Sequence, residues 1–167
     1  MNKLKIYLDT SIISHLEQTE KPAEQSDCIE LFERIKRGEY DAYISHVTMR
    51  EIDDCTEPLR SILQHHLDNI KYTAIDETEE VLDLADKLMA AGVLSKRNVD
   101  DCRHIAAAVA AKCDIVVSLN FRHIVNPKTS KGVRTVCFNE GYKIIDIYSP
   151  KSIVEEDNDN AVRCSKT

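Results

Sequence analysis

Short apolar segments of strand length alternate with longer segments of helical periodicity along most of this chain. The short segments predict strands at residues 4–8, 41–45, 72–75, 114–118 and 143–148. Between them, apolar residues recur at spacings of three and four, which indicates amphipathic helices. Parallel strands need a crossover connection that a helix usually supplies, so this alternation predicts βα units around a parallel sheet. We therefore expect an α/β protein.

Two of the expected helices carry recognisable start signals. Pro22 suits the first turn of a helix that ends near Gly38 and has Ile29 on its apolar face. Thr48 and Glu51 have the spacing of a capping box, which predicts a helix start there and gives Glu51 a structural role as an alternative to a functional one. Further helices are predicted at residues 59–66, 81–92, 105–111 and 132–140, with a final helical turn from Pro150.

One domain at residues 1–154 accounts for this pattern, followed by a polar tail at residues 155–167 that we expect to be disordered. Only 4 Gly and 4 Pro occur among 167 residues, which disfavours long flexible linkers. The formal net charge of −7 gives no overall electrostatic reason to bind nucleic acid, because phosphate contacts need positive charge. Such a function would have to depend on local charge.

The 6 cysteines include no C-x-x-C pair, so neither a zinc ribbon nor a disulfide framework is indicated. No segment has the apolar length of a signal peptide or of a membrane span. We therefore expect a soluble, cytoplasmic protein with reduced thiols and no membrane partner.

Four polar residues occupy comparable places relative to the predicted elements: Asp9 after the first strand, Glu51 in the helix after the second, Asp101 near a helix start and Asn120 after the fourth strand. The carboxyl ends of parallel strands meet at one edge of a sheet, where α/β proteins bind ligands, so these side chains are expected to converge. Oxygen ligands of this kind suit Mg²⁺ or Mn²⁺. Taken singly, each acid, and Asp100 likewise, is also explained as a turn residue or a helix cap.

The segments around these residues carry ordered motifs. Residues 7–11 read Tyr-Leu-Asp-Thr-Ser, residues 45–52 contain Ser-x-x-Thr-x-x-Glu, residues 101–106 contain Asp-x-x-His-x-Ala, and residues 118–120 read Ser-Leu-Asn. Together they resemble the motifs of the PIN-domain family of metal-dependent ribonucleases, which includes toxins of bacterial and archaeal toxin–antitoxin pairs. The resemblance extends over about residues 4–150. The ordered set is far more specific than any single motif.

This resemblance implies a three-layer α/β/α fold with a central parallel sheet of about five strands in the order 3-2-1-4-5. That order puts strands 1 and 4 at a topological switch point, where a ligand crevice is expected. It also implies an endoribonuclease that hydrolyses RNA with Mg²⁺ or Mn²⁺ held mainly by Asp9 and Asp101, while Glu51 would bind a second ion or act as general base. Asn120 would orient the water or the phosphate. The family further suggests a homodimer and an antitoxin protein as partner.

Other polar residues are expected to support this site or its substrate. The Ser11 and Ser118 hydroxyls and the His104 ring are candidates to hold the metal ligands in place. No acid occurs between residues 115 and 139, where the basic side chains are Arg122, His123, Lys128, Lys131 and Arg134. We expect these five to contact RNA, with an ordinary solvated loop as the alternative.

Asn120 departs from many active PIN proteins, which carry a fourth acid at this position. The neutral side chain removes one negative charge, so we expect one metal ion rather than two. A catalytically weak or inactive PIN module that binds RNA or a protein is therefore an alternative. A haloacid-dehalogenase-like phosphotransferase, in which Asp9 attacks phosphorus, is disfavoured, because that chemistry uses a second Asp two residues later, where this chain has Ser11.

Overall fold

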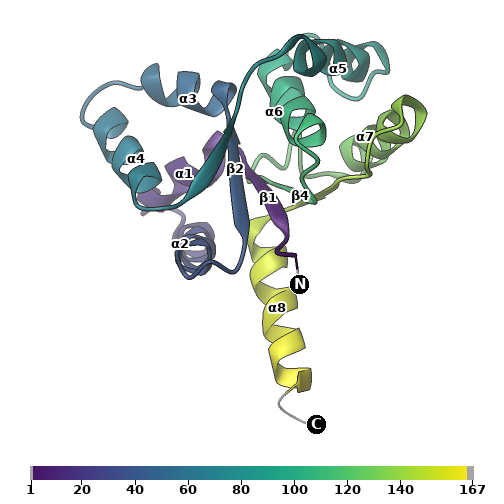
Figure 1. Ribbon diagram of the computed structural model, residues 1–167. Helices are drawn as coiled ribbons and strands as arrows, with labels where there is room; N and C mark the ends of the chain where they lie inside the picture. Colours follow the sequence, from purple (N-terminus) through teal and green to yellow (C-terminus); the bar gives the residue numbers. More distant parts are fainter. Residues whose placement is uncertain (1, 165–167) are drawn as a thin grey trace.

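A computed structural model describes residues 2–164 and contains one parallel sheet with the strand order β3-β2-β1-β4-β5 (Figure 1). Every neighbouring pair of strands is parallel. The strands are β1 (Lys5–Leu8), β2 (Asp41–Ser45), β3 (Tyr72–Ile75), β4 (Ile115–Val117) and β5 (Asp146–Tyr148). The predicted fold class and strand order are both confirmed, and β1 and β4 lie side by side at the centre, where the order reverses.

Helices cover both faces of this sheet, which makes three layers (Figure 1). One face packs against α5 (Glu79–Ala90), α6 (Val99–Ala110) and α7 (Pro127–Glu140). The other packs against α1 (Thr10–Ser14), the 3₁₀ turn η1 (His15–Glu17), α2 (Pro22–Lys36), α4 (Leu59–Asp68) and the first turns of α8 (Pro150–Cys164). Helix α3 (His46–Asp53) follows β2 directly at the carboxyl edge of the sheet and contacts α6.

The side chains of β1 alternate between the two cores. Ile6 and Leu8 pack with α1 and α2, whereas Tyr7 packs on the opposite face with α6, and all three side chains are fully buried. A strand that is covered on both faces needs apolar residues throughout, which explains its nearly continuous apolar sequence. Tyr7 is the exception, because its hydroxyl must find a polar partner inside the protein.

The predicted capping box at Thr48 and Glu51 is wrong. Helix α3 begins at His46, and the Ser45 side chain accepts the hydrogen bond from the Val47 backbone N–H. Ser45 has the extended backbone of the strand that it ends, and this is the conformation of an N-cap residue. Glu51 therefore lies one turn further into the helix and is free for other contacts.

Helix α7 is longer than predicted, because it begins at Pro127 rather than near Gly132. The Asn126 side chain accepts from the Thr129 backbone N–H, and proline follows at the first helical position, where no N–H is required. On α2, the expected apolar position Ile29 is 46% exposed and lies outside the core.

The expected disorder from residue 155 onward is contradicted up to Cys164, because these residues continue α8. The reason is a set of long-range contacts to the end of α2: the Arg34 guanidinium donates to Asp157 (2.9 Å) and Asn158 (3.0 Å), and the Tyr40 hydroxyl donates to Asp157. The helix extends away from the body of the protein (Figure 1). The last part of the predicted tail, residues 165–167, lies outside the described residues.

The described helices include none that is long and apolar enough to cross a membrane. Of the cysteines, the five whose side chains the structure describes are all free thiols: Cys28, Cys55, Cys102, Cys113 and Cys137.

Candidate active site

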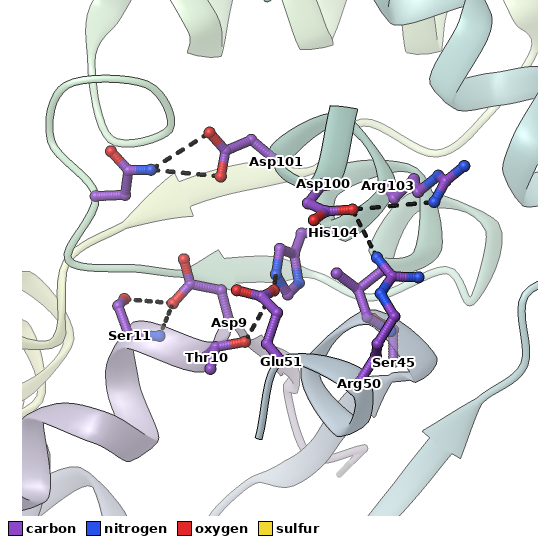
Figure 2. A network of polar contacts seen from close by, with 12 residues as sticks. Asp9, Thr10, Ser11, Ser45, Arg50, Glu51, Asp100, Asp101, Arg103 and His104 are labelled. Carbon is purple, nitrogen blue, oxygen red and sulfur yellow. Dashed lines mark hydrogen bonds and ion pairs between the residues drawn. The ribbon is translucent and has the colours of Figure 1, made fainter. Parts of the chain in front are cut away.

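The four residues predicted from the sequence lie around the carboxyl edge of the sheet. Asp9 directly follows β1, Glu51 is in α3, Asp101 is in the first turn of α6, and Asn120 is in the loop after β4. Figure 2 shows the Asp9, Glu51 and Asp101 carboxylates around one space. They are close enough for the charges of Asp9 and Glu51 to raise the pKa of Asp101. Parallel topology brings these distant residues together, since all the strands end at this edge.

Asp9 is the most firmly held of the four. It is only 4% exposed, and its Oδ1 atom accepts hydrogen bonds from the Ser11 backbone N–H (2.9 Å) and the Ser11 hydroxyl. Its Oδ2 atom accepts from the Ser118 hydroxyl at 2.5 Å. Both serine oxygens in turn accept backbone N–H groups, from Leu119 and Asn120 respectively, which aims their protons at the carboxylate. The structure thus places both candidate supporting serines against Asp9.

Glu51 is held by a chain of buried polar groups. Its Oε1 atom lies 2.6 Å from His104 Nε2 and accepts from the Thr10 hydroxyl at 3.2 Å. The other ring nitrogen of His104 lies 2.5 Å from the Tyr7 hydroxyl, which is 2.7 Å from the Ser45 hydroxyl. The chain therefore joins β1, β2, α3 and α6 behind the site.

The charges of Glu51 and His104 support each other. Burial alone would raise the pKa of Glu51, but the hydrogen bond and charge of His104 outweigh it, so this pKa is lowered. Burial alone would lower the pKa of His104, but the bond to Glu51 and the charges of Asp9, Glu51 and Asp101 raise it. Both shifts favour an ionised carboxylate beside a protonated imidazole.

Asp101 is in the opposite situation, because burial and the Asp9 and Glu51 charges raise its pKa despite the nearby His104 and His123. Within the described part of the chain, its oxygens have only long contacts, at 3.4 and 3.5 Å, with the Asn120 amide nitrogen. The Asn120 oxygen accepts from the His123 backbone N–H at 3.0 Å, which turns the amide nitrogen toward Asp101.

The neighbouring Asp100 faces away from this cluster. Its carboxylate lies 2.6 Å from an Arg50 nitrogen and 3.9 Å from Arg103, and its side chain is about half exposed (Figure 2). Consecutive residues of a helix point about 100° apart, so only one of the two aspartates can face the carboxylate cluster. In the structure, Asp101 is the one that faces the cluster.

These residues have the chemistry of a hard-cation site without a closed ligand cage. Among residues 2–164, no three His, Cys, Asp or Glu side chains stand close enough together to hold a metal ion as they are oriented here. Among the described residues, the oxygens of Asp101 nevertheless lack a strong partner, and burial, with a smaller contribution from the Asp9 and Glu51 charges, raises its pKa. A divalent cation beside it would favour the ionised form. Carboxylate oxygens are the ligands that Mg²⁺ and Mn²⁺ prefer. The donor set therefore fits such an ion.

The five basic residues predicted to contact RNA do not lie together. Arg122, His123 and Lys128 line one groove of about 270 Å³ next to the site. Arg134 is instead paired with Asp146 at 2.6 Å, and Lys131 is exposed on α7 outside that groove.

The residues that sequence reasoning missed are Tyr7, Thr10 and Ser45. Two signals were present in the sequence. Tyr7 is a hydroxyl-bearing residue within an apolar strand, which demands a buried partner. Ser45 ends a strand one residue before a helix, which is the position of an N-cap.

The parallel sheet with the strand order 3-2-1-4-5 is consistent with a PIN-like fold. Among solved structures, this chain is similar to a chain of VapBC2 from Rickettsia felis bound to a DNA fragment from their promoter. The TM-score is 0.55 and the identity 15%, over 87% of this chain and 98% of that one, so the likeness concerns the fold. No protein-family model matches the sequence, and no curated protein does.

Proposed function

We propose that this protein is a PIN-type endoribonuclease that hydrolyses RNA phosphodiester bonds with Mg²⁺ or Mn²⁺. One observation carries the proposal: the Asp101 carboxylate, partly buried beside Asp9 and Glu51, has a raised pKa, and in the described part of the chain it forms no ion pair. A carboxylate without an ion-pair partner, beside two others at the ligand-binding edge of an α/β sheet, favours a cation and an anionic substrate there.

Asp9, Asp101 and Glu51 would hold the metal ion. When bound, such an ion neutralises charge on a phosphate and makes water a stronger acid. Asp9 contributes a ligand that is already fixed by two serine hydroxyls. Asn120, as a neutral donor and acceptor near Asp101, would orient the phosphate or the attacking water.

Asn120 also bears on the number of ions. A fourth carboxylate would add one more negative charge to the cluster, whereas the neutral amide adds none. Two close divalent cations require more negative charge than one, so we propose a single ion.

The test is cleavage of single-stranded RNA by the purified protein with Mg²⁺, with Mn²⁺ and with EDTA. Asp101→Asn should lower cleavage at least about a hundredfold, whereas Asp100→Asn, one residue away on the same helix, should retain it. Mn²⁺ binding measured by calorimetry without RNA gives a second readout. The proposal fails if the folded wild-type protein neither binds Mn²⁺ nor cleaves RNA with either metal.

A second candidate is a PIN module that binds RNA or a protein without catalysis. The neutral Asn120 favours it, as does the open arrangement of the carboxylates. One similar solved structure is that of VapBC2, which supports an antitoxin-like protein as partner. Absence of divalent-metal binding in the calorimetric titration would favour this candidate. A homodimer and a cytoplasmic location remain predictions, the first of which sedimentation would test.

A further inference from the structure

Helix α1, which directly follows Asp9, spans only five residues, Thr10–Ser14. A helix this short is not stable by itself, because fixing the first turn costs more free energy than one turn of hydrogen bonds recovers. Contacts at its two ends must therefore hold it. At its start, Asp9 caps the helix by accepting the Ser11 backbone N–H. The atom that caps α1 thus belongs to the carboxylate that we propose as a metal ligand.

The other end of α1 is closed by His15, the first residue of η1. Its ring Nδ1 lies 2.7 Å from the Ser11 backbone carbonyl oxygen, and its Nε2 lies 3.1 Å from the Glu24 carboxylate on α2. Each nitrogen faces an oxygen that can only accept, so the protonated ring donates to both. The His15 side chain is 16% exposed, so these contacts are largely shielded from water.

The Ser11 carbonyl also accepts from two groups close to it in the chain. These are the Ser14 hydroxyl, at 3.1 Å, and the His15 backbone N–H. Both donors belong to α1 or to its C-cap, and a helix of one turn cannot anchor itself. The His15 ring differs from them because its second nitrogen is fixed to another helix, α2, which is 15 residues long.

A path of hydrogen bonds therefore leads from α2 to the candidate metal site. Glu24 holds the His15 ring, and the ring holds the Ser11 carbonyl. Ser11 in turn holds Asp9 through its backbone N–H and its hydroxyl (Figure 2). On the opposite side, the Ser11 hydroxyl accepts from the Leu119 backbone N–H, just after β4. Ser11 is thus fixed between α2 and the loop after β4.

We propose that His15, held by Glu24, is a positioning residue for Asp9. It acts through Ser11, because it fixes the backbone of the residue whose N–H and hydroxyl orient the Asp9 carboxylate. A ligand that is held in place before a cation arrives loses less freedom on binding it, so loss of this contact weakens metal binding. The proposal rests on the proposed function in taking Asp9 as a metal ligand.

Hydrogen exchange of the Ser11 backbone N–H, measured by NMR on the full metal-free protein, tests the positioning without metal or RNA. His15→Ala removes both ring contacts. His15→Asn keeps a donor where Nδ1 stands and loses only the contact with Glu24. Exchange should be about tenfold faster in His15→Ala, the effect expected for one lost hydrogen bond, and His15→Asn should restore most of the protection.

The matched control is His66→Ala. His66, on α4, lies 2.5 Å from the Glu17 carboxylate of η1, so this variant also removes a His–Glu contact between η1 and a neighbouring helix. It leaves the Ser11 carbonyl untouched. Ser11 exchange in His66→Ala should match the wild type, even where its urea midpoint falls as far as that of His15→Ala.

Mn²⁺ binding by calorimetry gives the second readout. His15→Ala should lower the affinity about tenfold, the low end of the effect of groups that orient metal ligands, because His15 acts one residue further away. His15→Asn should recover most of this loss, and His66→Ala should bind Mn²⁺ like the wild type. A purely structural role would lower the stability of His15→Ala without this difference in affinity.

Equal Ser11 exchange in His15→Ala and His66→Ala would overturn the proposal. Equal Mn²⁺ affinity in these two variants, when the wild type binds Mn²⁺, would also overturn it and would leave the nuclease proposal intact. If the wild-type protein binds no Mn²⁺, the proposed metal site is wrong, and the exchange rates decide by themselves whether His15 orients Asp9.

Discussion

His104 and Glu51, on helices α6 and α3, are joined through Nε2 and Oε1 at 2.6 Å. The ring is only 3% exposed and is fixed from behind by the Tyr7 hydroxyl. Glu51 lies at the candidate metal site, whereas His104 and Tyr7 lie in the protein core. Orientation of Glu51 and stability of the fold are thereby linked.

Tyr7→Phe should destabilise the protein by about 1–3 kcal/mol, because it leaves His104 Nδ1 and the Ser45 hydroxyl without their buried partner. Urea unfolding measures this change. Tyr142→Phe removes a hydroxyl that bonds Glu80 at an exposed site, and it should shift the free energy of unfolding by less than about 0.5 kcal/mol. Equal effects of the two variants would contradict a stabilising role for the buried hydrogen bonds of Tyr7 to Ser45 and His104.

Asp101→Asn should raise stability while lowering activity. The pKa of Asp101 is raised by burial and by neighbouring carboxylates, so its ionised form opposes folding at neutral pH in the absence of a cation. The isosteric amide removes this charge, and the urea midpoint of the metal-free protein should increase. RNA cleavage should fall at least about a hundredfold, since a lost metal ligand removes several kcal/mol of stabilisation from the transition state. A lower midpoint for Asp101→Asn than for Asp100→Asn would argue against crowded charge at this position.

Ser118→Ala should reduce cleavage about 10- to 100-fold by releasing both Asp9 and the Asn120 backbone. Mn²⁺ affinity should fall with it, because Asp9 loses one of the donors that orient it. Ser61→Ala, which deletes an exposed hydroxyl bound to Glu57, serves as the matched control. Unchanged Mn²⁺ affinity in Ser118→Ala would show that Asp9 needs no such support.

We expect Asp114, which lies far from the site, to make the free energy of unfolding depend on pH. Burial alone would raise its pKa, but hydrogen bonds from Lys143 and from the Lys5 backbone N–H lower it. A lowered pKa in the folded state means that the stabilisation is present above the unfolded value of about 3.9 and is lost as the pH falls through the folded value. Asp114→Asn should therefore cost about 1 kcal/mol at neutral pH. Urea unfolding at several pH values should show the two proteins converging in acid; a constant difference would exclude the carboxylate as the cause.

The sheet could be predicted because each strand has its own local signal, a short apolar run between helical patterns, as in β1 and β4. Asp9 and Asp101 could be proposed from their place next to those elements. The partners of Glu51 could not, because a capping box with Thr48 satisfies the same local pattern and only tertiary contact with α6 selects His104.

The groove beside the site could be predicted on one wall only. Arg122 and Lys128 were proposed as RNA contacts from the sequence, whereas the other wall, from Gly92 to Asn98, is a loop before α6 that gives no such signal. The packing of α6 and α7 on the same face of the sheet brings the two walls together, and no short-range pattern records that. Helix α8 was missed beyond residue 155 because Arg34, which holds it, is more than a hundred residues away.

The central place of β1 affects when the protein becomes functional during synthesis. This strand is made before the other four, yet it must pair with β4, and the Ser118 hydroxyl that fixes Asp9 lies 109 residues further along the chain. Contacts of such long range carry a loop-closure cost that slows folding. A nascent or truncated chain that ends before residue 118 has no assembled site, so translation itself delays any nuclease activity until the sheet has closed.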